Sequence, residues 1–327
     1  MRAALGLTAS LGAALVLAGA AAGTRVAAQA PAEPPAWAYP INTPGIQPPA
    51  DDGQPKRVPG SAVALTQAEI RNPFAPPDWH PADHPPAPDP VVKGRRPDAM
   101  ACGYCHYPNG QGRPENAALA GLPLEYIVQQ TMEFASGARK SSEPDMGPPK
   151  AMARVAKAAT EAEVREAAAY FAALAYQPWI RVEEASTVPK TIIAGGVHVP
   201  AEGGGTEPIG SRIIEMPQDP ARAAVRDTAS GFVAYVPTGS IARGENLVTT
   251  GGGRTVACGT CHGTDLKGLG PVPPIAGRSP SYLVRQLFDL KSGARDGAWS
   301  DLMDEAVRQL TVDDMIAIAA YTASRQP

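Results

Sequence analysis

Apolar residues recur at helical spacing in two separate regions of the chain. In the first region, Leu124, Ile127 and Val128 follow the three-to-four-residue spacing of one helix face. Pro123 suits the start of this helix and Gly137 suits its stop. No alternating strand pattern interrupts either region, so each is predicted to form a small all-α domain.

The two regions repeat one another. At an offset of 156 residues, the matched positions are Tyr126 with Tyr282, Gln130 with Gln286, and residues 136–139 with 292–295. After five extra residues in the first copy, the offset becomes 151 and the matched positions are Met152 with Met303, Thr160 with Thr311, and Tyr170 with Tyr321. Each matched Thr opens a capping box, which predicts the start of a last helix in each repeat.

The repeats are separated and preceded by stretches rich in proline and glycine. Residues 31–90 hold 17 of the 36 prolines, which predicts an extended segment without a core of its own. Residues 177–237 are predicted to be irregular, with short β-like runs at Lys190–Ile193, Arg212–Met216 and Phe232–Val236.

The first residues of the chain resemble an export signal. Arg2 precedes an uncharged run of Ala, Leu, Val and Gly, and small residues follow at Ala27 and Ala28. We expect a signal peptide over residues 1–28; the alternative is an uncleaved membrane anchor. A formal net charge of −3 gives no basic footprint for nucleic acid.

All four cysteines belong to two Cys-x-x-Cys-His motifs, one in each repeat. The motif residues are Cys102, Cys105 and His106 in the first repeat, and Cys258, Cys261 and His262 in the second. This spacing allows both sulfurs to bond one edge of a haem, with the histidine as an axial ligand of the iron. The sequence therefore predicts two covalently bound haem c groups.

Other functions of Cys-x-x-Cys fit the chain less well. The two halves of a Cys₄ zinc site should lie about 15–20 residues apart, whereas these motifs lie in different repeats. A thioredoxin-like pair would need a βαβ context. A disulfide within each motif would leave His106 and His262 unexplained.

A second axial ligand is expected from a methionine in each repeat. Met152 and Met303 occupy equivalent positions, each eight residues before the Thr that caps the last helix. A thioether suits haem iron in either oxidation state. We therefore predict these two methionines as distal ligands, with Met146 as the alternative in the first repeat.

With these motifs, the repeats resemble class I cytochrome c domains, and the pair resembles the di-haem cytochrome c4 family. The resemblance covers about residues 91–176 and 238–327. It implies an all-α fold of two cytochrome c domains in tandem, between long irregular segments. The predicted plan is a signal peptide (1–28), a Pro-rich extended segment (29–90), domain 1 (91–176), an irregular interdomain segment (177–237) and domain 2 (238–327).

The resemblance also implies particular contacts. Gly244 should pack against the last helix near Tyr321, and the Pro273 carbonyl should accept a hydrogen bond from His262. Ala117 stands at the corresponding place in the first repeat. The chain departs from the family in two ways. Its Pro-rich segment before the first repeat (29–90, here called the arm) and its interdomain segment are longer, and Pro97 interrupts the expected N-terminal helix of the first repeat.

Several polar residues have two possible roles. Arg139 and Arg295 could pair with haem propionates or could compensate the C-terminal charge of a helix. His80 and His84 stand among prolines, where a loop histidine is expected to face solvent. His198 has no supporting pattern.

The resemblance implies an exported, periplasmic electron carrier with no catalytic residues. Its partners would be redox proteins, namely a dehydrogenase, a quinol-oxidising complex or a terminal oxidase, with no nucleic acid. The membrane would be reached only through a partner or an uncleaved anchor. Two alternatives stay open: a dedicated subunit of a dehydrogenase or oxidase complex, and a di-haem enzyme of the peroxidase or thiosulfate dehydrogenase type.

Overall fold

The computed structural model describes Met1 and residues 33–327. The predicted signal peptide, residues 1–28, therefore lies outside the described residues apart from Met1. In the part of the chain that is described, no helix has the length and apolar character that crossing a membrane requires.

The first repeat folds into helices that follow the predicted pattern. They are α2 (Asp89–Val92), α3 (Cys102–His106), α4 (Leu124–Ser136), α5 (Gly147–Ala158) and α6 (Glu161–Ala173). Gly137 ends α4 in the left-handed conformation (φ 83°), and Thr160 caps α6 in a capping box with Glu163. A long N-terminal helix was not expected in this repeat because of Pro97, and the helix before the motif is indeed the short α2.

The second repeat has the same order of helices with a longer first one. They are α8 (Ser240–Thr250), α9 (Gly259–His262), α10 (Pro280–Lys291), α11 (Asp301–Val307) and α12 (Val312–Ala323). Thr311 and Asp314 form the second predicted capping box. A Cβ built on Gly244 of α8 would meet the Ala317 carbonyl oxygen and the Tyr321 Cβ, so the predicted close approach of α8 and α12 is confirmed.

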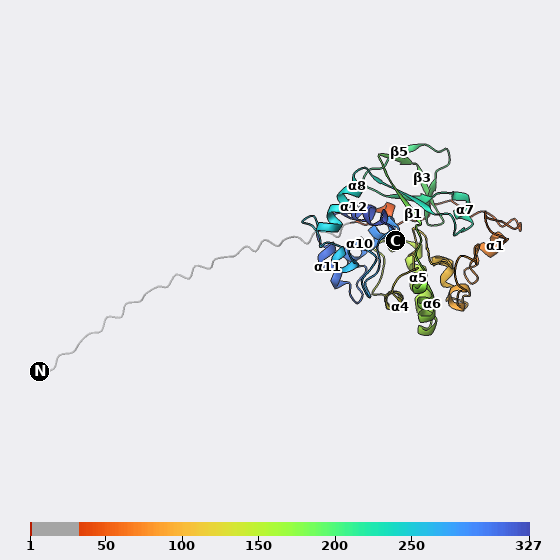
Figure 1. The fold of residues 1–327 in the computed structure, drawn as a ribbon, viewed down its shortest axis with the longest axis horizontal. Coiled ribbons are helices and arrows are strands. Elements are labelled where there is room, and N and C mark those ends of the chain that lie inside the picture. The colour runs from red at the N-terminus through yellow and green to blue at the C-terminus, as the bar shows by residue number, and fades with distance from the viewer. Residues whose placement is uncertain (2–32) are drawn as a thin grey trace. The chain divides into compact units, whose positions relative to one another are not determined.

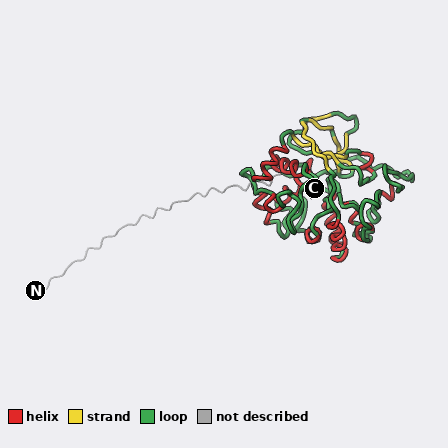
Figure 2. The backbone as a smooth tube through the Cα atoms, viewed as in Figure 1, coloured by secondary structure: helices red, strands yellow, loops and turns green. Residues whose placement is uncertain are grey.

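The expectation of an all-α chain is wrong, because the segment between the repeats contains strands. They are β1 (Ile180–Ala185), β2 (Thr187–Pro189), β3 (Thr191–Ala194), β4 (Val197–Pro200), β5 (Thr206–Pro208), β6 (Ile214–Pro217) and β7 (Phe232–Pro237), joined by the short helix α7 (Pro220–Ala224). Figures 1 and 2 show them gathered on one side of the folded body.

These strands pair in three small sheets. In the largest, β7 lies in the middle, parallel to β1 and antiparallel to β6; β2 pairs with β5, and β3 with β4. Gly195 and Gly196, both at positive φ, form the tight turn between β3 and β4. The β-like runs noted in the sequence fall on β3, β6 and β7. The segment was predicted to be irregular because the pairing of β1 with β7 joins residues about fifty positions apart, which no local pattern reveals.

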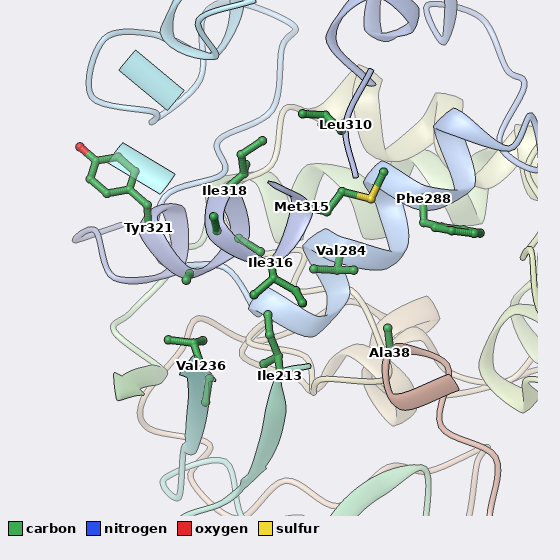
Figure 3. Packing of buried hydrophobic residues seen from close by; sticks show 14 of the residues in the cluster. Ala38, Ile213, Val236, Val284, Phe288, Leu310, Met315, Ile316, Ile318 and Tyr321 are labelled. Carbon is green, nitrogen blue, oxygen red and sulfur yellow. The ribbon is translucent and has the colours of Figure 1, made fainter. Parts of the chain in front are cut away.

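Each repeat has an apolar core, and the second core extends into the neighbouring segments. The first core is built on Val128, Ala168 and Phe171. In the second, Ile213 and Val236 pack against Ile316 of α12 (Figure 3). Ile213 and Val236 both come from residues 177–237 between the repeats, here called the β segment. The second core therefore depends on residues outside the repeat itself.

The proline-rich arm lies across the folded body and contributes buried residues. It contains a 3₁₀ turn, η1 (Ala36–Ala38), and the helix α1 (Gln67–Ile70). The Tyr39 hydroxyl donates to Asp289 of α10 (2.8 Å), and the Trp79 indole N–H donates to the Val225 carbonyl (2.8 Å). Both side chains are almost fully buried, so the arm is held by specific contacts.

Candidate haem-binding site

Both histidines of the Cys-x-x-Cys-His motifs are held in the same way by a backbone carbonyl. His106 Nδ1 lies 2.7 Å from the Ala117 oxygen, and His262 Nδ1 lies 2.8 Å from the Pro273 oxygen. Because a carbonyl oxygen only accepts, each Nδ1 carries the proton and each Nε2 keeps a free lone pair. The two expected carbonyl contacts are thereby confirmed.

Burial favours the neutral forms of the motif side chains. Desolvation lowers the pKa of both His106 and His262, and a neutral imidazole is the form that binds a metal. Desolvation also raises the pKa of Cys102 to about 12 and that of Cys258 to about 11. No disulfide joins any of the four cysteines, all of which lie among the described residues.

A single cavity of about 490 Å³ adjoins both motifs. Met152 of α5 and Met303 of α11 line it together with His106 and His262. These methionines stand on equivalent helices of the two repeats, so the structure brings all eight predicted site residues to one continuous cavity. Most of the remaining lining is apolar, as a haem pocket requires.

Met146 also lines the cavity, but its surroundings differ from those of Met152. Met146 is only 1% exposed and belongs to the apolar core of the second repeat, beside Tyr39 and Phe288. Its side chain thus joins the two repeats as a core residue, while Met152 stands at the position equivalent to Met303. This placement favours Met152 over Met146 as the ligand in the first repeat.

Arg139 and Arg295 occupy equivalent places in a network that crosses between the repeats. Arg139 Nη1 donates to Gln130 of its own repeat (2.8 Å), and its Nη2 donates to Gln286 of the other (2.6 Å). Arg295 bonds the same two glutamines in mirrored fashion, at 3.3 Å to Gln286 and 2.8 Å to Gln130. Neither role considered from the sequence anticipated this contact.

Tyrosines and backbone groups complete this symmetric contact. The Tyr282 hydroxyl accepts from Arg139 and the Tyr126 hydroxyl accepts from Arg295, both at 3.0 Å. Burial alone would raise the pKa of Tyr126, but the guanidinium groups of Arg295 and Arg139 outweigh it, so the pKa is lowered. The Lys140 N–H donates to the Ala294 carbonyl, and the Asp296 N–H to the Ala138 carbonyl (both 2.8 Å). Tyr126, Gln130 and Arg139 and their counterparts in the second repeat therefore meet at the interface between the repeats.

Two further buried arginines on the cavity wall were missed by the sequence comparison. Arg278 donates to the carbonyls of Ala118 (3.2 Å) and Ala120 (2.8 Å), and its Nε is buried without a partner among the described residues. Arg285 donates to the carbonyls of Ala38 (2.7 Å) and Pro114. Both are bonded to neutral groups and line the cavity. They escaped notice because the first repeat has Leu122 and Gln129 at these positions.

This donor set fits a haem group. The apolar cavity is lined by two neutral imidazoles with free Nε2 lone pairs, by two pairs of cysteines and by two thioethers. It is also lined by two buried guanidinium groups that have only neutral hydrogen-bond partners and could therefore bind carboxylates. A haem carries carboxylate-bearing propionates, and Arg binds carboxylates through its forked donors. The residues present therefore match the group that the motifs predict.

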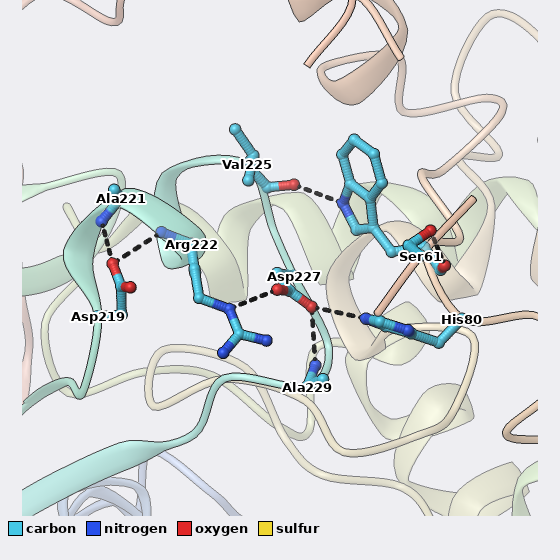
Figure 4. Close-up of polar contacts among 9 residues, drawn as sticks. Ser61, His80, Asp219, Ala221, Arg222, Val225, Asp227 and Ala229 are labelled. Carbon is cyan, nitrogen blue, oxygen red and sulfur yellow. Dashed lines mark hydrogen bonds and ion pairs between the residues drawn. The ribbon is translucent and has the colours of Figure 1, made fainter. Parts of the chain in front are cut away.

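The prediction that His80 and His84 face solvent is wrong. Their side chains are 10% and 6% exposed. His80 Nε2 lies 2.9 Å from the buried Asp227 carboxylate, as Figure 4 shows, and His84 lies beside Asp78 and the Tyr170 hydroxyl. The arm presses these side chains onto the β segment and α6, a long-range contact that proline spacing does not encode.

Comparison with known proteins gives relatives of one kind, although no family model matches the chain. The chain is 35% identical over 89 residues to cytochrome c-554(548) of Halomonas halodenitrificans, covering 27% of this chain and 99% of that protein. The chain belongs to the c-type cytochromes. It is also 32% identical over 84 residues to cytochrome c4 of Azotobacter vinelandii (24% of this chain, 40% of that protein).

A longer match covers more than two thirds of this cytochrome. It is 26% identical over 235 residues to the thiosulfate dehydrogenase electron acceptor of Thiomonas intermedia, covering 70% of this chain and 80% of that protein. Among solved structures, thiosulfate dehydrogenase TsdBA of Marichromatium purpuratum aligns with a TM-score of 0.45 and 27% identity over 69% of this chain, which spans 36% of that protein.

The predicted resemblance to di-haem cytochrome c4 is confirmed by these relatives. The protein is a di-haem cytochrome that carries two covalently attached haem c groups and mediates electron transfer. Its partners are redox proteins.

Proposed function

We propose that each repeat holds one haem through its two cysteines and ligates the iron with one histidine and one methionine. The attaching residues are Cys102, Cys105, Cys258 and Cys261, and the axial ligands are His106, Met152, His262 and Met303. The haem-binding domains would span 91–176 and 238–327. The observation that carries the assignment is the single cavity lined by all eight side chains, with both His rings oriented by carbonyls.

The chain's own residues account for the rest of an electron carrier's task. Bound haem iron supplies reversible one-electron oxidation and reduction. The carbonyls of Ala117 and Pro273 keep each imidazole in one tautomer and orientation. Apolar walls exclude water, and the buried guanidinium groups of Arg278 and Arg285 supply positive charge beside the cavity. With a methionine as the second ligand of each iron, as proposed, neither iron would keep an open position for a substrate.

We further propose that the protein accepts electrons from a dehydrogenase and is not itself the dehydrogenase. Similarity to a thiosulfate dehydrogenase electron acceptor along 80% of that protein supports this role. Because haem is attached to such motifs outside the cytoplasm, we infer that the protein is exported to the periplasm. A terminal oxidase would then be an electron acceptor, whereas a quinol-oxidising complex, which releases electrons, would be a second donor.

The proposal is tested on the purified holoprotein. Two haems per chain in the pyridine complex, a Met-to-iron charge-transfer band in the oxidised form and no response to carbon monoxide are expected. Thiosulfate alone should leave the protein oxidised, whereas thiosulfate with a thiosulfate dehydrogenase should reduce it. Carbon monoxide binding, or reduction by thiosulfate alone, would favour a di-haem enzyme.

A pair of variants tests the ligand in the first repeat. Met152→Ala should remove about half of the charge-transfer band, since one of two thioether ligands is lost. Met146→Leu should keep the full band, because Leu replaces a buried core side chain of similar volume. Loss of the band in Met146→Leu, with the band intact in Met152→Ala, would transfer the assignment to Met146.

A further inference from the structure

The first Cys-x-x-Cys-His motif is covered by the segment between the repeats. The Arg226 guanidinium stacks over the ring of Tyr104 within the motif (4.5 Å) and over the ring of Tyr107 just after it (5.2 Å). Trp179 and Phe232 pack around Tyr107, which is almost fully buried. Trp179, Arg226 and Phe232 are here called the cover. The contact of His80 with Asp227 holds the arm next to it (Figure 4).

The same face of the second repeat is open. Thr260 and Gly263 stand where the first repeat has Tyr104 and Tyr107, so the aromatic groups that anchor the cover are missing. Cys261 is exposed, whereas Cys105 is partly buried. The chain therefore shields one haem-binding motif and leaves the other accessible.

Four large apolar side chains of the second repeat are exposed. Val256, Leu269, Trp299 and Leu302, here called the second-repeat patch, are 41%, 61%, 48% and 72% exposed. Val256, Trp299 and Leu302 also line the cavity, beside Cys261 and Met303.

The patch is held in place by its backbone. The Thr255 hydroxyl donates to the Ala306 carbonyl (2.7 Å), which ties the residue before Val256 to the helix that carries Leu302. Trp299 has a φ of 74°, a conformation unfavourable for a bulky residue, and this backbone keeps the indole at the surface.

The first repeat has no equivalent patch. At the corresponding positions stand Met100, Arg113, Pro148 and Ala151. Arg113, which replaces Leu269, is buried and paired with Glu115 (2.9 Å). An exposed apolar group of this kind, present on one repeat only and next to a redox site, marks a protein interaction surface.

The charges beside the patch indicate the partner. Asp301 and Asp304 of α11 flank Leu302, are exposed, and form no ion pair among the described residues. Of the nearby cations, Arg308 pairs with Glu305 (2.6 Å), and Arg254 (3.5 Å) shares Asp314 with Arg243 (2.6 Å). The Lys267 ammonium donates to the Pro327 carbonyl (2.8 Å). The patch is therefore an apolar centre with an acidic edge.

We propose that the second-repeat patch is the surface on which this cytochrome docks a redox protein whose own docking face has an apolar centre and a basic rim. Electrons enter and leave the protein at the second repeat, and the covered first repeat exchanges electrons through the second across the shared cavity. This inference rests on the proposed electron-carrier function and adds the docking face and the partner's chemistry.

The surface can be mapped without any electron transfer. The holoprotein, labelled with ¹⁵N and shown to contain two haems, is titrated with a basic mono-haem cytochrome c in the same oxidation state. Amide shifts are expected in residues 254–272 and 296–308, and not in residues 100–116 or 226–232. Shifts centred on the first repeat or on the β segment would overturn the proposal.

Matched variants then test the patch itself. Leu302→Asp should weaken binding of the basic cytochrome about tenfold, as for a central apolar anchor. Asp301→Asn combined with Asp304→Asn should lower the association rate and its salt dependence. Ile46→Asp makes the same kind of change at an exposed arm residue outside the patch (41%) and should have no effect. Equal binding by wild type and Leu302→Asp would refute the docking face, whereas a protein without two haems would refute the electron carrier itself.

Discussion

The close approach of α8 and α12 makes a quantitative prediction at Gly244. A Cβ at this position would lie 1.9 Å from the Ala317 carbonyl oxygen and 2.8 Å from the Tyr321 Cβ, whereas ordinary contact begins at 3.4 Å. In Gly244→Ala the two helices would have to separate by about 1.5 Å, or the α12 backbone would have to bend. Both atoms belong to backbone or to its first side-chain carbon, so no flexible group can move aside.

The expected cost follows from two opposing effects. Overpacking of a dense core costs about 1–3 kcal/mol, and replacing a helical Gly with Ala returns about 0.5–1 kcal/mol. We expect Gly244→Ala to lose about 1–2 kcal/mol net, which lowers the melting temperature by about 2–3 °C for a chain of 327 residues. Ile318 and Thr322 of α12 line the cavity. We therefore expect the thermal change in absorbance of the second haem to occur at a lower temperature in the variant than in the wild type.

Thermal unfolding followed by circular dichroism and by haem absorbance measures this effect. Gly147→Ala is the matched control, because Gly147 begins α5 and a Cβ there would meet nothing within 4 Å. The control should melt at or slightly above the wild-type temperature. If Gly244→Ala melted together with Gly147→Ala, the argument that glycine is needed for the contact of α8 with α12 would be refuted.

Two further predictions concern polar contacts. In a double-mutant cycle of Arg295→Met with Tyr126→Phe, measured by denaturant unfolding, we expect a coupling energy of about 1–2 kcal/mol, as for a buried hydrogen bond to a charged group; a value near zero would show that the cross-repeat contact adds no stability. The hydrogen bond to Asp78 raises the pKa of His84 despite its burial, so its stabilising contribution should be full below about pH 6.5 and should fade as the pH rises through the folded-state pKa. The loss of stability in His84→Asn should therefore be larger at pH 5.5 than at pH 8.5, and His198→Asn should show the reverse trend, since burial lowers the pKa of His198.

Local signals in the sequence were sufficient for the repeats. Helix stops such as Gly137, capping boxes such as Thr160 with Glu163, and the register of Met152 with Met303 each depend on residues a few positions apart or on a constant offset. These features predicted the helices and identified eight candidate site residues, all of which line one cavity in the structure.

Long-range contacts of the connecting segments could not be predicted in this way. The parallel pairing of β1 with β7 and the burial of His80 against Asp227 join residues far apart, without a repeated pattern to relate them. Proline spacing in the arm suggested an extended chain, yet Trp79 is buried because Val225 offers its carbonyl and an apolar surface. The error on the fold class has the same origin.

Comparing the two copies position by position distinguishes two kinds of residue. A contact between related halves places the same residue types on both sides, so the interface conserves what each half presents to the other. Tyr126, Gln130 and Arg139 match their counterparts for this reason, and they meet across the interface. Their identity in both copies is a property of the pair rather than of each haem pocket alone.

Residues that differ between the copies mark where the two halves meet different surroundings. Tyr104 and Tyr107 receive the stacked Arg226 from the connecting segment, while Thr260 and Gly263 leave the second motif open. Arg113 is buried in an ion pair where Leu269 is exposed. These differences separate the covered motif of the first repeat from the open motif of the second, where the proposed docking partner would bind.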